Sequence, residues 1–186
     1  MEPLMWRPFL LLDLPQEYDV LFSRYFQRQC INCNKAPLFP FVCLLCSTLV
    51  CLDTCCSISD VGHERSLPTN EVERHSLECG GDACCFIALN SSLIVVVREG
   101  LAAVWGSVYL DAHGEEDRNL RREGFSLELE SSVERSMALG KPLFLSPRRV
   151  DCLRSDWAEQ EFERTGATWS TMAGLQQLLR DAHLLR

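Results

Sequence analysis

Residues 30–56, CINCNKAPLFPFVCLLCSTLVCLDTCC, carry seven of the eleven cysteines in this chain of 186 residues. The region that they open, residues 30–85, is rich in turns and has little of the regular apolar spacing that marks a helix or a strand. Its local backbone preferences are therefore too weak to fold it. We expect a bound metal ion to organise this region and so to decide the fold.

The spacing of these cysteines is typical of structural zinc. A tight C-x-x-C turn lets two thiolates converge on one ion at about 2.3 Å, and tetrahedral coordination takes two further ligands from elsewhere in the chain. Four protein ligands leave no position for a reacting water, so we interpret the zinc as structural. The sequence offers two such turns and one H-x-x-x-C unit, namely Cys30/Cys33, Cys43/Cys46 and His75/Cys79.

The sequence leaves the partition of these ligands open. Our first choice is a single ion, held by Cys43, Cys46, His75 and Cys79. The alternative adds a second ion, held by Cys30, Cys33, Cys51 and one of Cys55 or Cys56, with Cys56 preferred.

Other cysteines are expected to be small hydrophobic residues. Adjacent cysteines rarely both bind one metal, so at least one member of each of the pairs Cys55-Cys56 and Cys84-Cys85 is predicted to be buried in the core. Cys152 lies on the apolar face of a predicted late helix and is also expected in the core.

A high cysteine content is also typical of secreted proteins that are held together by disulfides. The opening residues, MEPLMWRPFLLLDLP, place Glu2 where a signal peptide needs positive charge, and their apolar run is short. We therefore predict a cytoplasmic protein, in which clustered thiols hold metal more often than they pair with each other.

Composition and charge exclude further classes. An apolar content of 47% is enough for one domain with a core, or for two small ones. The net charge of −8 argues against a nucleic-acid partner, because phosphate binding needs a concentration of Lys and Arg. The most apolar stretch, FIALNSSLIVVVREGLAAVW, is interrupted by polar residues and lacks the roughly 18 apolar residues in a row of a membrane helix. We expect neither nucleic acid nor membrane as a partner.

The expected fold class is α+β, a small zinc-stabilised domain. Apolar spacing predicts an amphipathic helix over residues 14–29, and short β-branched runs predict an antiparallel β-meander over residues 86–110, with strands at 86–89, 93–98, 101–105 and 108–110. Two C-terminal helices are predicted, with Val150, Leu153 and Trp157 on the apolar face of one and Met172, Leu175, Leu178 and Leu179 on that of the other.

Six stretches occur in order over residues 6–165: LPQEYDVLFSRY, RQCINCNKAPLFPFVCLLC, LVCLDTCC, HSLECGG, WGSVYLDAHGEEDRNLRR and GKPLFLSPRRVDCL. Together they resemble the C-terminal domain of the UBR-box E3 ubiquitin ligases, the N-recognins of the N-degron pathway. The resemblance implies a zinc-binding cap with a proposed autoinhibitory role. It also implies two partners: the remainder of a UBR-type ligase, within one chain or in trans, and indirectly a ubiquitin-conjugating enzyme.

The resemblance divides the chain into an N-terminal segment at 1–13, the cap domain at 14–165 and a C-terminal helix within 166–186. Inside the cap domain lie the zinc-binding region, the meander and an insert at residues 123–138 that the family usually lacks. The family usually has glycine where this chain has Ser47.

The sequence offers no residues for ubiquitin transfer itself. A RING needs a histidine shortly after a cysteine in its middle and a closing C-x-x-C, and neither is in the chain. No activating motif surrounds a Cys–His nucleophile pair either. We predict a part of a ligase with no catalytic residues of its own. The alternative is a free-standing structural-zinc interaction module unrelated to ubiquitin.

An acidic segment, YLDAHGEED, follows the meander. Its carboxylates are candidates to bind a hard cation or an Arg-bearing partner, and the alternative is a solvated acidic loop. If the segment is functional, we expect it to contact a basic surface elsewhere in the ligase. The candidate interaction residues are Asp111, Glu115, Glu116 and Asp117.

Overall fold

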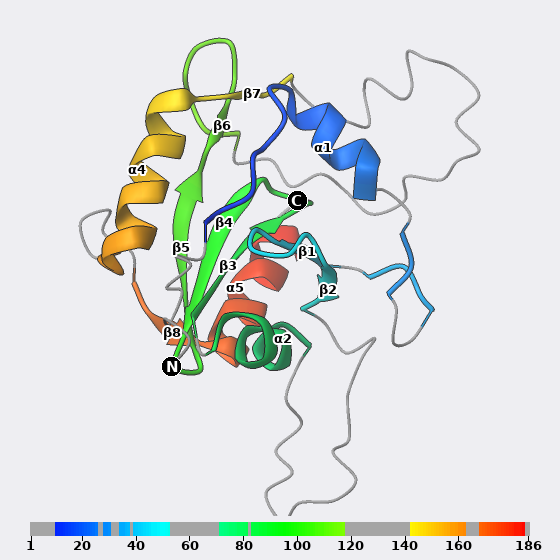
Figure 1. Ribbon diagram of the computed structural model, residues 1–186. Coiled ribbons are helices and arrows are strands. Elements are labelled where there is room, and N and C mark those ends of the chain that lie inside the picture. Colours follow the sequence, from blue (N-terminus) through cyan, green and yellow to red (C-terminus); the bar gives the residue numbers. More distant parts are fainter. Residues whose placement is uncertain are drawn as a thin grey trace, which may run out of the picture.

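The computed structural model describes residues 10–25, 28–30, 34–37, 39–52, 71–81, 83–117, 142–162 and 168–184. The expected α+β class is confirmed, with helices packed on an antiparallel sheet (Figure 1). In chain order the elements are α1 (Tyr18–Tyr25), β1 (Pro40–Cys43), β2 (Leu49–Cys51), α2 (Glu71–Gly80), β3 (Ala83–Ala88), β4 (Leu93–Arg98), β5 (Leu101–Ser107), β6 (Tyr109–Leu110), β7 (Phe144–Leu145), α4 (Pro147–Glu159), β8 (Ser170–Thr171) and α5 (Met172–Leu184).

The main sheet has the strand order β2-β1-β3-β4-β5-β8. The predicted meander forms its centre as β3, β4 and β5, where β-branched side chains suit a sheet that is buried on both faces. The last strand predicted for the meander, β6, leaves this sheet and pairs with β7. In the cysteine-rich region the chain forms β1, β2 and α2, which sequence periodicity did not predict.

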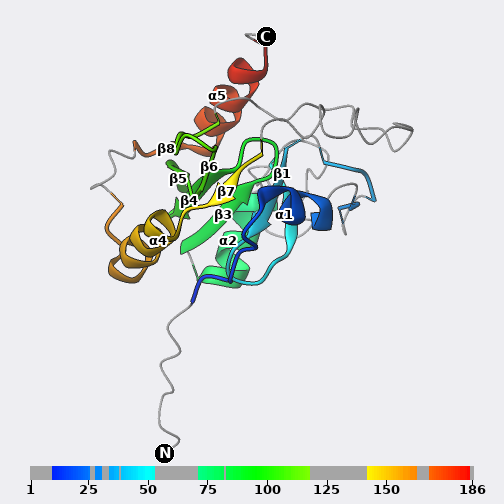
Figure 2. The same ribbon diagram turned by 90° about the horizontal axis from the view of Figure 1, so that it is seen from above.

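Each face of the main sheet has its own core. Strand alternation sends Cys85, Ile87 and Val96 to the face covered by α1 and α4, where they pack with Leu153 and Trp157. The opposite face is covered by α2 and α5. It gathers a second group of apolar residues, which includes Phe41, Cys43, Cys84, Phe86 and Leu175. Figure 2 shows α4 and α5 on opposite sides of the strands.

The predicted helices form, with differences in detail. Helix α1 covers part of the range predicted for it, and its Tyr18 is fully buried with its hydroxyl donating to the carbonyl of Leu89. Helix α4 starts after Ser146, whose side chain accepts the amide N–H of Arg149. The prediction of a buried Cys152 was wrong, because this residue lies on the solvent side of α4.

Helix α5 buries Met172 and Leu175 as predicted, while Leu178 is 56% exposed. None of the helices in the described part of the chain has the length and apolar character needed to cross a bilayer.

Candidate metal centre

Five side chains with metal-ligand chemistry meet beside the edge of the sheet. Cys43 ends β1, Cys46 lies in the turn after it, and Cys84 lies on the neighbouring strand β3. Helix α2 packs on β2 and β3 and presents His75 and Cys79, which its four-residue spacing places on one face. We call these five residues the cysteine–histidine cluster.

The ligand atoms of the cluster are close together. The Sγ atom of Cys43 lies 3.4 Å from that of Cys84 and 4.0 Å from that of Cys79. Cys46 Sγ lies 3.2 Å from His75 Nε2. One ligand atom from each of Cys43, His75, Cys79 and Cys84 lies within 4.8 Å of all the others. These separations are those of side chains that can share one ion.

The turn after Cys43 explains how two cysteines reach the cluster. The amide of Ser47 donates to the carbonyl of Cys43 at 2.9 Å, and the amide of Cys43 donates to the carbonyl of Thr48 at 3.0 Å. The amide of Leu45 points at the Cys43 Sγ atom, 3.4 Å away. To close this turn Ser47 takes a left-handed backbone, with φ of 63°. The C-x-x-C spacing therefore forms the tight turn that metal binding needs.

Burial and mutual contacts raise the pKa values of the cluster thiols. A hydrogen bond to Cys84, followed by burial, raises the pKa of the Cys43 thiol from 9.0 to about 12. Burial, followed by the charge of Cys43, raises the pKa of Cys79 to about 12 as well. Without a cation these thiols are protonated at neutral pH, whereas a bound divalent ion reverses the preference and deprotonates them. Thiol and imidazole donors suit a soft or borderline divalent metal, so the cluster can hold a metal ion.

Of the four ligands chosen from the sequence, Cys43, His75 and Cys79 belong to the set of ligand atoms within 4.8 Å of one another, and the fourth member of that set is Cys84. The remaining choice, Cys46, contacts His75. Cys84 and Cys85 are both fully buried, but they face opposite sides of the sheet. Sequence reasoning assigned at least one of the pair to the core, and the alternation of strand β3 decides that Cys85 takes that place.

The second predicted ligand set is only partly within the described residues. Cys30 and Cys51 lie together with Glu71, a residue that the sequence analysis did not consider. Cys33, Cys55 and Cys56 lie outside the residues that the structure describes.

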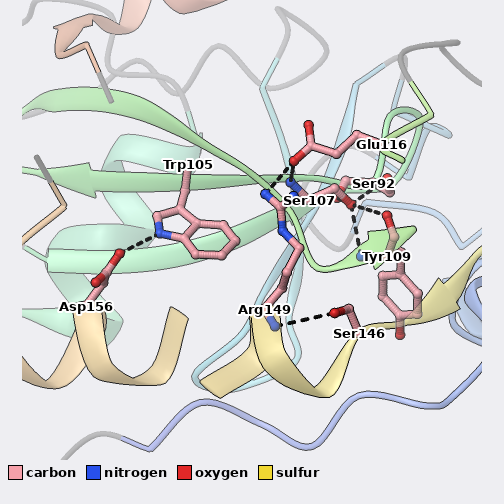
Figure 3. Close-up of polar contacts among 8 residues, drawn as sticks. All are labelled: Ser92, Trp105, Ser107, Tyr109, Glu116, Ser146, Arg149 and Asp156. Atoms are coloured by element: carbon pink, nitrogen blue, oxygen red, sulfur yellow. Dashed lines mark hydrogen bonds and ion pairs between the residues drawn. The ribbon is translucent and has the colours of Figure 1, made fainter. Parts of the chain in front are cut away.

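The acidic segment after β6 folds back on the sheet and on α4. Glu116 Oε1 lies 2.5 Å from Arg149 Nη2 and accepts the amide N–H of Ser107 at 2.9 Å (Figure 3). Asp111 Oδ1 accepts two amide N–H groups of its own loop, from His113 at 2.8 Å and Glu115 at 3.0 Å. The side chains of Glu116 and Asp111 thus hold the shape of the loop, while Glu115 is exposed.

The Trp-Gly pair before this segment makes room for the contact. Trp105 is an extra residue in β5, because Gly106 pairs with Ile94 and Val104 with Val95. Gly106 has φ of 121°, and a Cβ atom on it would lie 2.8 Å from Glu116 Oε1. Trp105 Nε1 donates to the buried Asp156 of α4 at 2.8 Å (Figure 3).

The fold and the cluster define a small cysteine-rich α+β domain with the side chains of a metal centre. The chain belongs to the Proteolysis_6 C-terminal family, because residues 3–131 match the sequence model of that family.

Relatives with this region are named as E3 ubiquitin-protein ligases. The chain is 40% identical over 166 residues to E3 ubiquitin-protein ligase Ubr3 of Drosophila melanogaster, covering 89% of this chain and 6% of that protein. It is 35% identical over 164 residues to E3 ubiquitin-protein ligase UBR3 of Homo sapiens, covering 88% and 7%. Similarity to E3 ubiquitin-protein ligase PRT6 of Arabidopsis thaliana is 32% over 117 residues, covering 62% and 5%. The chain thus spans a small fraction of the length of these relatives.

Proposed function

We propose that this chain is a non-catalytic, zinc-binding part of an E3 ubiquitin-protein ligase that acts in the N-degron pathway. The observation that carries the proposal is the cysteine–histidine cluster. It occurs in a chain whose relatives are named as E3 ubiquitin-protein ligases. In this proposal zinc stabilises the fold, and ubiquitin transfer takes place elsewhere in the ligase.

The proposed ligands are Cys43, Cys46, His75 and Cys79. Tetrahedral zinc with Zn–S bonds of about 2.3 Å separates two ligand sulfurs by roughly 3.8 Å, which is close to the 4.0 Å between Cys43 and Cys79. These residues come from β1, its turn and α2, so one ion would tie the helix to the sheet edge.

Cys84 is assigned a supporting role in this proposal. Its Sγ atom lies 3.4 Å from that of Cys43, at the distance of a sulfur–sulfur hydrogen bond. A thiol beside a metal-bound thiolate donates to it and holds it in place.

The role proposed for the domain is that of an autoinhibitory cap. It would contact the remainder of a UBR-type ligase, within one chain or in trans, and affect a ubiquitin-conjugating enzyme indirectly. The acidic segment supports this assignment, because Glu116 and Arg149 fix it to α4 while Glu115 is exposed. Rigid carboxylates can hold a basic surface by salt-sensitive pairing, and Asp111 and Asp117 belong to the same proposed surface.

The test uses a full-length ligase that contains this chain. Changing Asp111, Glu115 and Asp117 to their amides should raise basal ubiquitination of a substrate several-fold at low salt, with the metal content unchanged. Glu116 stays unaltered because its ion pair with Arg149 fixes the loop to α4, whereas asparagine at position 111 keeps the side-chain oxygen that accepts the loop amides. The matched control is Asp151→Asn on the exposed side of α4. Equal activity of the triple variant, the control and the wild type across a salt series would refute the cap role of the acidic segment.

A further inference from the structure

A second group of buried ligand atoms lies away from the cysteine–histidine cluster. Cys30, Cys51 and Glu71 bring two thiols and a carboxylate within 4.8 Å of one another. All three residues are buried, with exposures of 1%, 0% and 4%. We propose that these residues form a second metal site, which takes a divalent cation of the zinc class and uses Glu71 as a ligand.

The described residues around Cys30 make the same backbone hydrogen bonds as the residues of the turn that follows Cys43. In each, the fifth residue donates its amide to the carbonyl of the first, and the amide of the first donates to the carbonyl of the sixth. The fifth residue is left-handed in both, with φ of 55° and 63°. The residues are Cys30, Asn34 and Lys35 in one case and Cys43, Ser47 and Thr48 in the other. The same hydrogen-bond pattern therefore occurs at both cysteines, and each of the two thiols lies in a group of ligand atoms.

The distances in the second group suit a tetrahedral ion. Bonds of about 2.3 Å to sulfur and about 2.0 Å to oxygen, at tetrahedral angles, separate the two ligand atoms by roughly 3.5 Å. Glu71 Oε2 lies 3.5 Å from Cys30 Sγ. The same oxygen accepts the backbone amide of Cys51 at 2.8 Å, and this hydrogen bond fixes the carboxylate beside the thiols.

Helix α2 connects the two groups. Glu71, His75 and Cys79 follow one another at four-residue intervals and therefore lie along one face of the helix, about 6 Å apart per step. Cys51 pairs with Pro40 at the start of β1, whereas Cys43 ends that strand. The helix thus offers Glu71 near one end of the β1–β2 pair and His75 and Cys79 near the other. Ligands on a helix and on strands are held more firmly than ligands on loops.

A purely structural role for Glu71 makes a different prediction. A carboxylate in the first turn of a helix is favoured by the helix dipole, and it can anchor the Cys51 amide without any metal. Glu71→Gln separates the two roles. The glutamine side chain has nearly the same shape and still offers an oxygen to the Cys51 amide, but it is a much poorer metal ligand.

The experiment counts metal ions in the full 186-residue chain by elemental analysis and native mass spectrometry, after expression with zinc. We expect two ions in the wild type and one in Glu71→Gln and in Cys51→Ser. Glu78→Gln on the exposed side of α2 and Cys152→Ser on α4 are matched controls and should keep two. Titration of zinc against a competing chelator should show an affinity loss in Glu71→Gln of at least about tenfold for one of the two ions.

Two results would overturn the second site. The first is a wild-type chain that binds one ion, which Cys79→Ser removes. This result does not require any variant of Cys30, Cys51 or Glu71 to fold. The second is two ions in Glu71→Gln with unchanged affinities, which would leave Glu71 with its structural role alone. The proposed zinc site at the cysteine–histidine cluster fails separately, if Cys79→Ser and Cys46→Ser leave the metal content unaltered.

Discussion

The two faces of the main sheet differ in the side chains that cover them, although the same strands build both. On the face covered by α1 and α4, large side chains such as Tyr18, Tyr109 and Trp157 pack against one another. On the other face, α2 and α5 cover a second apolar core, and α2 also presents the ligand-type residues His75 and Cys79. Both faces bury apolar side chains, and under the proposed function a bound metal would add to the stability of the second face alone.

Removing the metal should have the largest effect and should be confined to one face. A structural zinc site contributes on the order of 10 kcal/mol to folding, because the ligands gather only in the folded state. A strong chelator, or Cys43→Ser, should remove hydrogen-exchange protection from β1, β2 and α2, while β4, β5 and α4 keep much of theirs. Mass-spectrometric hydrogen exchange measures both. Unchanged protection after complete loss of metal would show that the two faces do not differ in this way.

Breaking the other face should leave the metal in place. Trp157→Ala removes a side chain that packs against Phe162 with ring centroids 6.2 Å apart and is only 7% exposed. Loss of such a buried aromatic costs about 3–5 kcal/mol. We expect a much lower urea midpoint for the metal-loaded chain together with an unaltered metal content. A variant that lost its metal under native conditions would mean that the faces fold as one inseparable unit.

The neighbouring cysteines of β3 give the sharpest comparison, since one faces each side. Cys85→Ala should lower stability by about 1 kcal/mol, the scale of deleting one methyl-sized group from a core, and leave metal affinity unchanged. Cys84→Ala should retain the ion but weaken its binding by about 10–100-fold, as loss of a supporting hydrogen bond does. Competition with a chelator measures both affinities. If Cys84→Ala lost the ion completely and Cys46→Ala retained it, Cys84 would be the metal ligand and Cys46 would have the supporting role.

How much the sequence predicted differs between the elements. Apolar periodicity predicted α1, α4, α5 and the central strands, because burial of one side of an element produces a repeating apolar pattern in its sequence. Helix α2 escaped prediction because its apolar pattern is weak, with Val72 as a fully buried apolar residue. The four-residue spacing of Glu71, His75 and Cys79 indicates a helix, but this spacing becomes visible only when glutamate is counted among the ligand residues. The exposure of Cys152 was not predicted either, because its neighbour Leu153 is buried in α4 while Cys152 itself is exposed.

The sequence suggested ligand residues but not the geometry that brings them together. Spacing predicted Cys43, Cys46, His75 and Cys79, of which the structure places Cys43, His75 and Cys79 within one close set of ligand atoms. The position of Cys84 depends on the pairing of Cys43 with Phe86 across β1 and β3, which is a long-range register. No local rule fixes such a register, so which cysteine of the pair faced the cluster could not be read from the chain.

The smallest expected effect concerns the backbone of the cysteine turn. Ser47 is exposed and has φ of 63°. A left-handed conformation costs a residue with a Cβ atom roughly 1–2 kcal/mol, while glycine adopts it freely but loses more entropy on folding. These two terms nearly cancel, so Ser47→Gly should stabilise the metal-loaded chain by about 0.5 kcal/mol. Ser155→Gly in the exposed interior of α4 lacks the first term and should destabilise by about 0.5–1 kcal/mol. Urea unfolding of both variants would show changes of opposite sign in the free energy of unfolding. If Ser47→Gly destabilised the chain as much as Ser155→Gly does, the left-handed backbone at Ser47 would carry no strain.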